Sequence, residues 1–168
     1  MRRLAIVLAL FVITLSSLIC PVKAADDSDG YFILCHPESF LNARFSPSKH
    51  GSMIGQLYCG DYVETDGKKK NGFAHCINLS FETPDGWIST GYMVETEPVI
   101  EQFAATVEAN GRVACREKIG GKVVRWVRPG SEVTVFAYTD EWCVTNKGYI
   151  KTEYLRASTT TEKYAPME

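Results

Sequence analysis

The sequence predicts an all-β protein made of two small tandem domains behind a cleaved signal peptide. Two observations predict this fold class. One pattern of residues occurs twice along the chain, which indicates an internal structural repeat. Between the repeated residues lie short apolar or alternating segments separated by turn residues, and no segment carries a sustained helical stripe with caps. Short strands at regular spacing are typical of a β-sandwich or a β-barrel.

The repeat consists of three clusters of residues and a final tyrosine. From Gly60 to Gly130 the offset is 70 residues, and from Gly86 to Gly148 it is 62. Equal spacing within clusters and unequal spacing between them indicate matching strands joined by loops of different length. The first copy reads Leu41-Asn42-Ala43-Arg44, Gly60-Asp61-Tyr62-Val63, Gly86-Trp87-Ile88 and Tyr92, and the second reads Val113-Ala114-Cys115-Arg116, Gly130-Ser131-Glu132-Val133, Gly148-Tyr149-Ile150 and Tyr154.

The N-terminus is typical of a secretory signal peptide. Arg2 and Arg3 precede an almost wholly apolar segment, residues 4–19, and the residues up to Ala24 form a cleavage site. A retained membrane anchor is the alternative, but about 16 apolar residues fall short of the ~20 that span a bilayer. We therefore expect residues 1–24 to be removed, the protein to be secreted, and no stable membrane insertion to follow.

Within each copy the predicted strands are short. Residues 132–136 alternate between polar and apolar side chains, as expected of a half-buried strand. Residues 104–107, 123–127 and 142–144 are rich in β-branched or aromatic side chains and are bounded by turn signals. The first copy follows the same plan with longer loops, including an insertion at residues 78–85.

The domain boundaries follow from the repeat. We expect the first domain to span residues 31–97 and the second to span residues 103–156. The linker between them is too short for independent tumbling, so a fixed tandem is expected. Residues 157–168 are rich in serine and threonine and predict a disordered tail.

Five cysteines survive cleavage, and in a secreted chain they are expected to form disulfides. Each copy is close to the size below which a single core is marginal, so cross-links would stabilise it. Cys115 and Cys143 are the only pair in the second copy, which makes a Cys115–Cys143 disulfide the simplest connectivity. The first copy contains three, and we predict a Cys35–Cys76 disulfide, with Cys59 free or linked to a second molecule.

Charge is distributed unequally between the copies. Removal of residues 1–24 leaves 15 basic and 20 acidic side chains, a formal balance of −5. Residues 31–98 carry −3 and residues 103–156 carry +3, with six basic side chains in the 17 residues from Arg112 to Arg128. This stretch would suit an anionic polymer, or it is a solvated face that complements the acidic first copy. A secreted, net acidic chain is not expected to bind nucleic acid.

Further residues accompany the clusters of the first copy, namely Ser46-Pro47-Ser48, Ile54, Gly55, Leu57 and Phe73. Together with Leu41, Asn42, Arg44, Gly60, Asp61, Val63, Gly86, Trp87, Ile88 and Tyr92, this order resembles the bacterial SH3-like (SH3b) domain over residues 31–97. The second copy resembles it less closely. Ser131 replaces the aspartate of the family pattern and Tyr149 replaces the tryptophan, whereas Trp142 occupies the place of the mid-domain aromatic.

The resemblance implies that each copy is a small, strongly curved β-barrel and that the chain is a non-catalytic module of a secreted bacterial protein. Relatives of this kind are commonly attached to cell-wall hydrolases, which they hold on peptidoglycan. It also implies that some aromatic side chains line a ligand groove, because SH3-like folds bind extended ligands along aromatic-lined grooves.

The aromatic residues at matching positions are therefore either core or groove wall. We expect Trp87 and Trp142 at the surface, and Trp126 is a further candidate for the groove. Val124 and Trp126 share one face of a strand, which we expect to point inward or into the contact between the copies. The predicted ligand-binding residues are Phe73, Trp87, Tyr92, Trp142, Tyr149, Tyr154, Arg116 and Arg125.

Neither catalysis nor a metal site is expected, and no cofactor is implied. His75 and Cys76 are adjacent, so on a strand they point to opposite faces and do not form a catalytic couple. Cys35-His36 and His75-Cys76 contain ligand types that zinc accepts, but secretion favours a disulfide instead.

The sequence thus predicts a secreted binding protein that recognises cell-wall peptidoglycan or an associated anionic polymer. The alternative is a protein–protein module, an adaptor or inhibitor that uses the same groove on a polypeptide. A third hypothesis is a dimer linked through Cys59.

Overall fold

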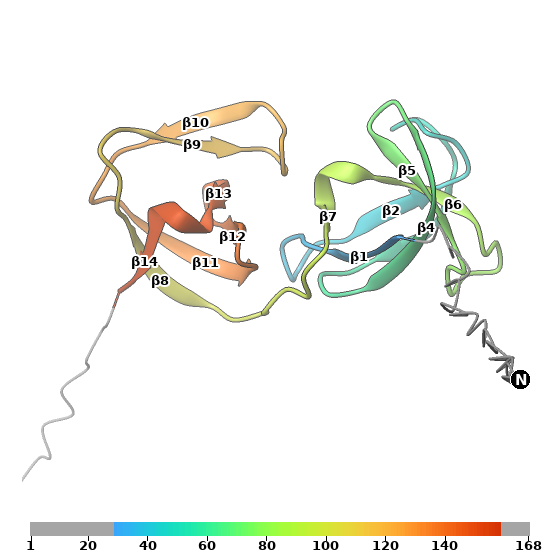
Figure 1. The fold of residues 1–168 in the computed structure, drawn as a ribbon, viewed down its shortest axis with the longest axis horizontal. Coiled ribbons are helices and arrows are strands. Elements are labelled where there is room, and N and C mark those ends of the chain that lie inside the picture. Colours follow the sequence, from blue (N-terminus) through green and yellow to red (C-terminus); the bar gives the residue numbers. More distant parts are fainter. Residues whose placement is uncertain (1–28, 159–168) are drawn as a thin grey trace, which may run out of the picture.

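The computed structural model describes residues 29–158, and its regular structure is all-β apart from two short 3-10 turns (Figure 1). This confirms the predicted fold class at the level of secondary structure. The predicted signal peptide, residues 1–24, lies outside the described residues, as do residues 159–168 of the predicted tail. Between residues 29 and 158, no helix is long and apolar enough to cross a bilayer.

Fourteen strands form two seven-stranded antiparallel sheets. The N-terminal sheet has the order β3-β2-β6-β5-β4-β1-β7, and the C-terminal sheet has the order β10-β9-β13-β12-β11-β8-β14. The second order is the first with every number raised by seven, so the two sheets share one topology. The strands of the N-terminal sheet are β1 (Asp29–Ile33), β2 (Leu41–Arg44), β3 (Met53–Leu57), β4 (Tyr62–Lys70), β5 (Phe73–Ile77), β6 (Gly86–Ser89) and β7 (Met93–Val94), with a 3-10 turn at Thr90–Tyr92. Those of the C-terminal sheet are β8 (Phe103–Val107), β9 (Val113–Arg116), β10 (Val123–Val127), β11 (Glu132–Tyr138), β12 (Trp142–Thr145), β13 (Gly148–Lys151) and β14 (Leu155–Ala157), with a 3-10 turn at Thr152–Tyr154.

The repeated glycines Gly60 and Gly130 build the same tight turn in both sheets. Their φ angles are +91° and +77°, a backbone region that residues with a Cβ rarely adopt. In each turn the glycine N–H donates across to the first strand of its sheet, from Gly60 to the Ile33 carbonyl and from Gly130 to the Val107 carbonyl, both at 2.8 Å. The repeated pattern therefore encodes a conformational requirement.

The repeated arginines Arg44 and Arg116 also share one role. Arg44 Nη1 donates to the Gly51 carbonyl and Arg116 Nη1 donates to the Gly121 carbonyl, each at 2.7 Å. Both bonds close the loop of a hairpin, β2–β3 in the first sheet and β9–β10 in the second. A charged donor satisfies a loop carbonyl that has no ladder partner.

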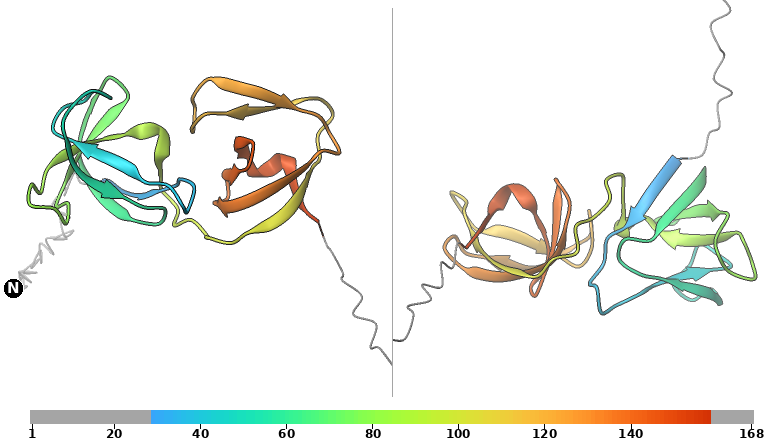
Figure 2. Two further views of the ribbon diagram at one scale, coloured as in Figure 1. Left: turned by 180° about the vertical axis from the view of Figure 1, so that it is seen from behind. Right: turned by 90° about the horizontal axis from the view of Figure 1, so that it is seen from below.

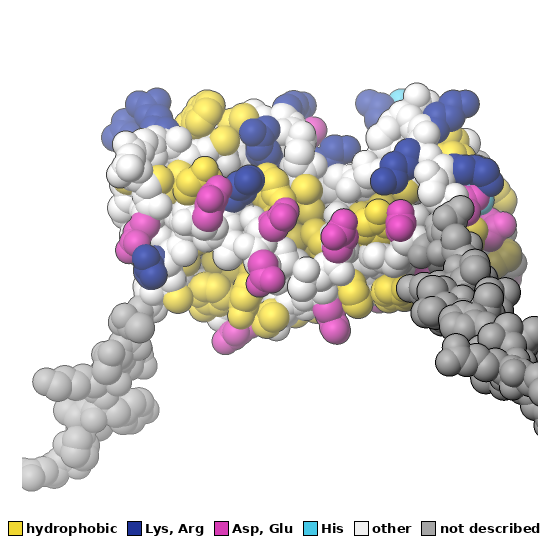
Figure 3. Space-filling view, in the orientation of Figure 1, with side chains coloured by type: hydrophobic (Ala, Val, Ile, Leu, Met, Phe, Trp, Pro, Cys, Tyr) yellow, Lys and Arg dark blue, Asp and Glu magenta, His cyan; other side chains and the backbone are white. Residues whose placement is uncertain are grey.

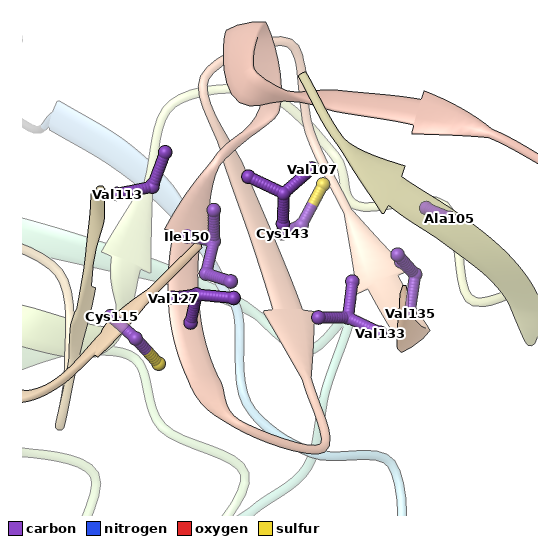
Figure 4. Close-up of a cluster of buried hydrophobic side chains, with 9 residues drawn as sticks. All are labelled: Ala105, Val107, Val113, Cys115, Val127, Val133, Val135, Cys143 and Ile150. Carbon is purple, nitrogen blue, oxygen red and sulfur yellow. The ribbon is translucent and has the colours of Figure 1, made fainter. Parts of the chain in front are cut away.

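Each sheet folds around its own apolar core, and Figure 4 shows the core of the C-terminal sheet. Val107, Val133, Val135 and Ile150 are at most 2% exposed there. Their counterparts in the N-terminal sheet include Ile33, Val63 and Ile88. Strand alternation places these side chains on the covered face.

Neither predicted disulfide is present, because all five cysteines in the described chain are free. Cys115 and Cys143 occupy one core, but their sulfur atoms point in different directions (Figure 4). Cys115 Sγ donates to the Lys147 carbonyl, and Cys143 Sγ lies 3.4 Å from Thr152 Oγ1. In the N-terminal sheet, the fully buried Cys76 Sγ faces the Ala74 carbonyl, and Cys35 Sγ donates to the Ser39 carbonyl at 3.9 Å.

The two sheets lie end to end along the long axis of the molecule (Figure 2). A third apolar cluster, which we call the interface cluster, joins them; its buried members are Leu34, Ala137, Trp142, Val144 and Tyr149. The Tyr149 hydroxyl donates to the Leu34 carbonyl across this contact, at 2.9 Å. Val99, in the linker, exchanges both backbone hydrogen bonds with Tyr138 at 2.9 Å, which ties the linker to β11.

The C-terminal boundary of the second sheet lies beyond Tyr154. Ala157 is the last residue of β14 and pairs with Ala105. Ser158 N donates to the Ala104 carbonyl at 2.9 Å. The first two residues of the predicted tail are therefore paired with β8.

Candidate ligand-binding clefts

A hollow with a volume of about 900 Å³ lies between the two sheets. We call it the interdomain cleft. The N-terminal sheet and its loops supply most of its lining, including Phe40, Arg44, Phe73 and Tyr92. The other wall comes from the second copy, where Lys118 and Tyr149 are among the lining residues.

The second hollow, of about 830 Å³, belongs to the second copy alone. We call it the C-terminal hollow. Its lining includes the basic residues Arg112, Arg116 and Lys151 and the aromatic residues Trp126, Trp142 and Tyr154.

The two hollows occupy equivalent places in the two copies. Phe73 pairs with Ser89 in the first sheet, and Trp142 pairs with Lys151 at the same step of the ladder in the second. Each pair lines its own hollow, together with the repeated arginine and the tyrosine of the 3-10 turn. The matched lining pairs are Arg44 with Arg116, Phe73 with Trp142, Ser89 with Lys151 and Tyr92 with Tyr154. The repeat has therefore duplicated a hollow as well as a strand topology.

What distinguishes the interdomain cleft is the wall that the second copy adds. Ile119 N donates to the Gly91 carbonyl at 3.0 Å, and Lys118 Nζ donates to Ser89 Oγ at 3.3 Å. The Tyr149 ring meets the Tyr92 ring edge-on, with 6.0 Å between centroids. Burial raises the pKa of Tyr149, so its hydroxyl stays a neutral donor to Leu34. These contacts hold the two walls in a fixed relation.

Polar groups on the cleft walls can pair with a ligand. Lys49 and His50 are exposed on the N-terminal side, and Glu117 and Lys118 lie opposite. The Asn42 side-chain oxygen is buried and has no hydrogen-bond partner within residues 29–158. A buried acceptor without a donor is costly.

Basic side chains gather along one edge of the molecule. In Figure 3, Lys and Arg lie along the upper edge, over the β9–β10 hairpin and over the N-terminal sheet, whereas Asp and Glu cross the middle of the same face. The surface is hollowed between the two halves at this edge. An anionic ligand would therefore meet positive charge beside the cleft.

The structure distributes the predicted ligand-binding residues over three places. Phe73, Tyr92 and Tyr149 line the interdomain cleft, and Arg116, Trp142 and Tyr154 line the C-terminal hollow. Trp87 and Arg125 line neither. Trp87 instead pairs with His75 on the neighbouring strand, with 5.0 Å between the ring centroids.

Two expectations about tryptophans are wrong. Trp142, expected at the surface, is only 9% exposed because it packs in the interface cluster. Val124 and Trp126, expected to point inward or into the contact between copies, are 47% and 60% exposed. They lie on β10, an edge strand of its sheet, where an irregular register between Val123 and Arg125 interrupts the pairing with β9.

The histidine and cysteine side chains of the first copy have separate partners. His75 Nδ1 lies 3.0 Å from Asp66 Oδ2, and Cys76 is buried on the other face of β5. Lys68 and His75 beside Asp66 lower the pKa of that carboxyl to about 2. His36 packs against Phe136, with 4.3 Å between the rings. Within residues 29–158, no three His, Cys, Asp or Glu side chains converge as a metal site would require.

Phe40, in the interdomain cleft, is a lining residue that the sequence did not single out, whereas Trp126, a further candidate from the sequence, lines the C-terminal hollow. Phe40 is 50% exposed and directly precedes the first repeated cluster. Strand periodicity does not predict an exposed aromatic side chain in a loop, so the position of Phe40 directly before the repeated cluster was the only signal in the sequence.

Comparisons with known proteins find distant structural likeness only. No family model matches the sequence, and no curated protein sequence matches it. Among solved structures, the chain is similar to NlpC1 and NlpC2 from Trichomonas vaginalis, with 23% and 20% identity and a TM-score of 0.33 in both cases. The matches cover 77% of this chain but only 45% and 48% of those proteins, so the chain spans less than half their length.

Proposed function

We propose that this chain is a secreted, non-catalytic tandem of SH3-like β-barrels that binds bacterial cell-wall peptidoglycan or an anionic polymer attached to it. The duplicated hollow supports the proposal most strongly. Equivalent positions line a hollow in each copy, with an arginine and two aromatic side chains in both. A polymer of repeating units presents the same group to both hollows, whereas a small soluble ligand would gain nothing from the tandem.

The lining of the hollows matches the chemistry of such a polymer. Aromatic walls with a few placed polar groups are the usual construction of ligand sites. The interdomain cleft combines Phe40, Phe73 and Tyr92 with Lys49 and Lys118. Glycan rings and peptide stems would lie against the aromatic side chains, and carboxylates or phosphates would meet the basic ones.

Co-sedimentation with insoluble cell walls tests the proposal. The processed protein is mixed with purified walls, either untreated or acid-extracted to remove attached anionic polymers, and the pelleted fraction is measured. We expect retention on at least one preparation at low salt, weakening as ionic strength rises because Lys and Arg contacts are screened. Retention on extracted walls would identify peptidoglycan as the ligand, and retention on untreated walls alone would identify the anionic polymer. A protein that stays in the supernatant on both preparations contradicts the proposal.

Two matched variants test whether wall binding uses the interdomain cleft. Phe40→Ala removes a half-exposed ring from the interdomain cleft, and Phe45→Ala removes a ring that is 60% exposed outside both hollows. We expect Phe40→Ala to weaken wall binding by about tenfold, as for a side chain in a ligand site. Phe45→Ala should bind like the parent protein. Equal loss in both variants would show that binding does not use the cleft.

A protein partner is the second candidate, and the exposed edge strand favours it. β10 is an edge strand of its sheet and presents Val124 and Trp126 to solvent. An extended polypeptide could add to this edge and cover both side chains. Val124 does not line the C-terminal hollow, so Val124→Ala separates the candidates. A protein interface on β10 would lose affinity in that variant with little salt dependence, whereas wall binding would not change.

A further inference from the structure

Cys35 and Cys59 are brought together by the turn at the start of β4. Asp61 N donates to the Tyr58 carbonyl at 3.1 Å, which closes the turn around Cys59 and Gly60. Gly60 N then donates to the Ile33 carbonyl at 2.8 Å. Cys59, one residue before Gly60, therefore lies beside the chain that continues past Ile33 to Cys35.

The side chains of the two cysteines pack in the same apolar cluster. Cys35 Sγ donates to the Ser39 carbonyl at 3.9 Å and lies beside Cys59. Cys35 is 4% exposed in the core of the N-terminal sheet, and Cys59 packs partly buried against the same core. Two thiols that pack in one cluster on adjacent segments need little movement to reach disulfide geometry.

The turn does not require these thiols. In the first copy, Gly60 N donates to the Ile33 carbonyl and Ile33 N donates to the Asp61 carbonyl. In the second copy, Gly130 N donates to the Val107 carbonyl and Val107 N donates to the Ser131 carbonyl in the same way. One residue before Gly130 stands Pro129, and two residues after Val107 stands Ala109. The same backbone therefore forms with no sulfur at either position, so the turn does not need the two thiols of the first copy.

The remaining cysteines are separated from this pair. Cys76, Cys115 and Cys143 are at most 2% exposed, and each thiol lies against an oxygen of its own sheet. Burial raises the pKa of each of these thiols and keeps an oxidant from reaching them. In contrast, Cys35 beside it lowers the pKa of Cys59 to about 7, and Cys59 is partly exposed.

We propose that Cys35 and Cys59 are an oxidation site that forms an intramolecular disulfide on contact with a low-molecular-weight disulfide of the glutathione type, RS–SR. The Cys59 thiolate attacks one oxidant sulfur, the RS–SR bond breaks, and a mixed disulfide forms as RS⁻ leaves. Cys35 sulfur then attacks Cys59 sulfur and displaces the second RS⁻. The two cysteines together lose two electrons and two protons, and the oxidant becomes two RSH.

The bond would lock a wall of the interdomain cleft. Cys35 lines that cleft, and the preceding residue, Leu34, accepts the hydrogen bond from Tyr149 of the second copy. A Cys35–Cys59 disulfide ties this segment to the turn at the start of β4. The proposal concerns the chain's own chemistry and does not depend on the identity of the ligand.

Thiol counting and peptide mapping test the proposal on the folded, processed protein. The protein is incubated with oxidised glutathione near neutral pH, and the remaining thiols are alkylated in denaturant. It is then digested without reduction and mapped by mass spectrometry. We expect the titratable thiols to fall from five to three, with one cross-linked peptide pair that contains Cys35 and Cys59. A link through Cys76, a Cys115–Cys143 link, a Cys59–Cys59 dimer or five persisting thiols would each overturn the assignment.

Serine variants check the result independently of the mapping. Cys59→Ser should abolish the cross-link, whereas Cys76→Ser should retain it, because Cys76 has no part in the exchange. The rate of oxidation of the parent protein should rise as the pH increases through about 7, since the attacking species is the Cys59 thiolate. A rate that does not change between pH 6 and pH 8 would contradict the role of Cys59 as the attacking thiol.

Discussion

Replacement of Tyr149 by phenylalanine removes one hydroxyl from the contact between the two copies. The Tyr149 side chain is 5% exposed, and its hydroxyl donates to the Leu34 carbonyl at 2.9 Å. Leu34 is fully buried in the interface cluster. Phenylalanine keeps the ring and its edge-on contact with Tyr92. The variant therefore isolates a single hydrogen bond that joins the copies.

The expected loss of stability follows from the burial of both partners. An ordinary hydrogen bond contributes about 0.5–1.5 kcal/mol net, but a buried acceptor left without a donor costs about 1–3 kcal/mol. Water cannot reach the Leu34 carbonyl without opening the cluster, so the higher range applies. With a urea m-value of about 2 kcal/mol/M, the unfolding midpoint should fall by about 0.5–1.5 M.

Urea unfolding followed by tryptophan fluorescence measures this loss, with Tyr58→Phe as the matched control. Tyr58 is 51% exposed, so removal of its hydroxyl should change the free energy of unfolding by less than about 0.5 kcal/mol. If Tyr149→Phe unfolds at the same urea concentration as Tyr58→Phe, the hydroxyl does not hold the copies together and the fixed cleft loses its main support.

Two further predictions concern the second copy's turn and the charge cluster of the first. Gly148→Ala should destabilise the protein by at least about 2 kcal/mol in thermal or urea unfolding, because the φ of +122° disfavours a side chain and the new Cβ would lie 2.6 Å from the Arg116 carbonyl oxygen. Gly111→Ala, with open space around it, is the control, and an equal effect in both would refute this reasoning. Asp66→Asn should lower the melting temperature near neutral pH, where the carboxylate contacts Lys68. The pKa of Asp66 is lowered from 3.8 to about 2, so the carboxylate stabilises the fold above about pH 4 and this stabilisation is lost as the pH falls to 2. A difference in melting temperature between parent and variant that persists at pH 2 would contradict this account.

Features that depend on one strand or one turn were predictable from the sequence. Alternation at residues 132–136 predicts a half-buried strand, and β11 alternates in burial over its whole length because side chains on a strand point to opposite faces in turn. The clusters at Gly60 and Gly130 recur because the turn needs a positive φ at both positions.

Features that depend on how the copies meet were not predictable. Trp87 and Tyr149 hold equivalent places in the repeat, yet Tyr149 is buried against Leu34, whereas Trp87 is only partly buried beside His75. The difference arises because that face of the second copy docks on the first copy. No periodicity within a single copy contains this information.

The cysteines illustrate the same limit at the level of atoms. The connectivity predicted from the sequence pairs Cys35 with Cys76, but the two are not bonded, and Cys76 Sγ faces the Ala74 carbonyl. The turn around Gly60 brings Cys59 beside Cys35 instead. Spacing along the chain does not determine which side chains a turn aligns.

The central claim is that two equivalent hollows bind one repeating wall polymer, and a double-variant titration tests it most directly. Wall affinity is measured for Phe40→Ala, for Trp126→Ala and for the two combined, because Phe40 lines the interdomain cleft and Trp126 lines the C-terminal hollow. Simultaneous engagement predicts that each single variant loses about tenfold in affinity and that the double variant loses about 100-fold or more. The claim is contradicted if the double variant has the same wall affinity as the single variant that binds less tightly. It is also contradicted if both single variants bind like the parent protein.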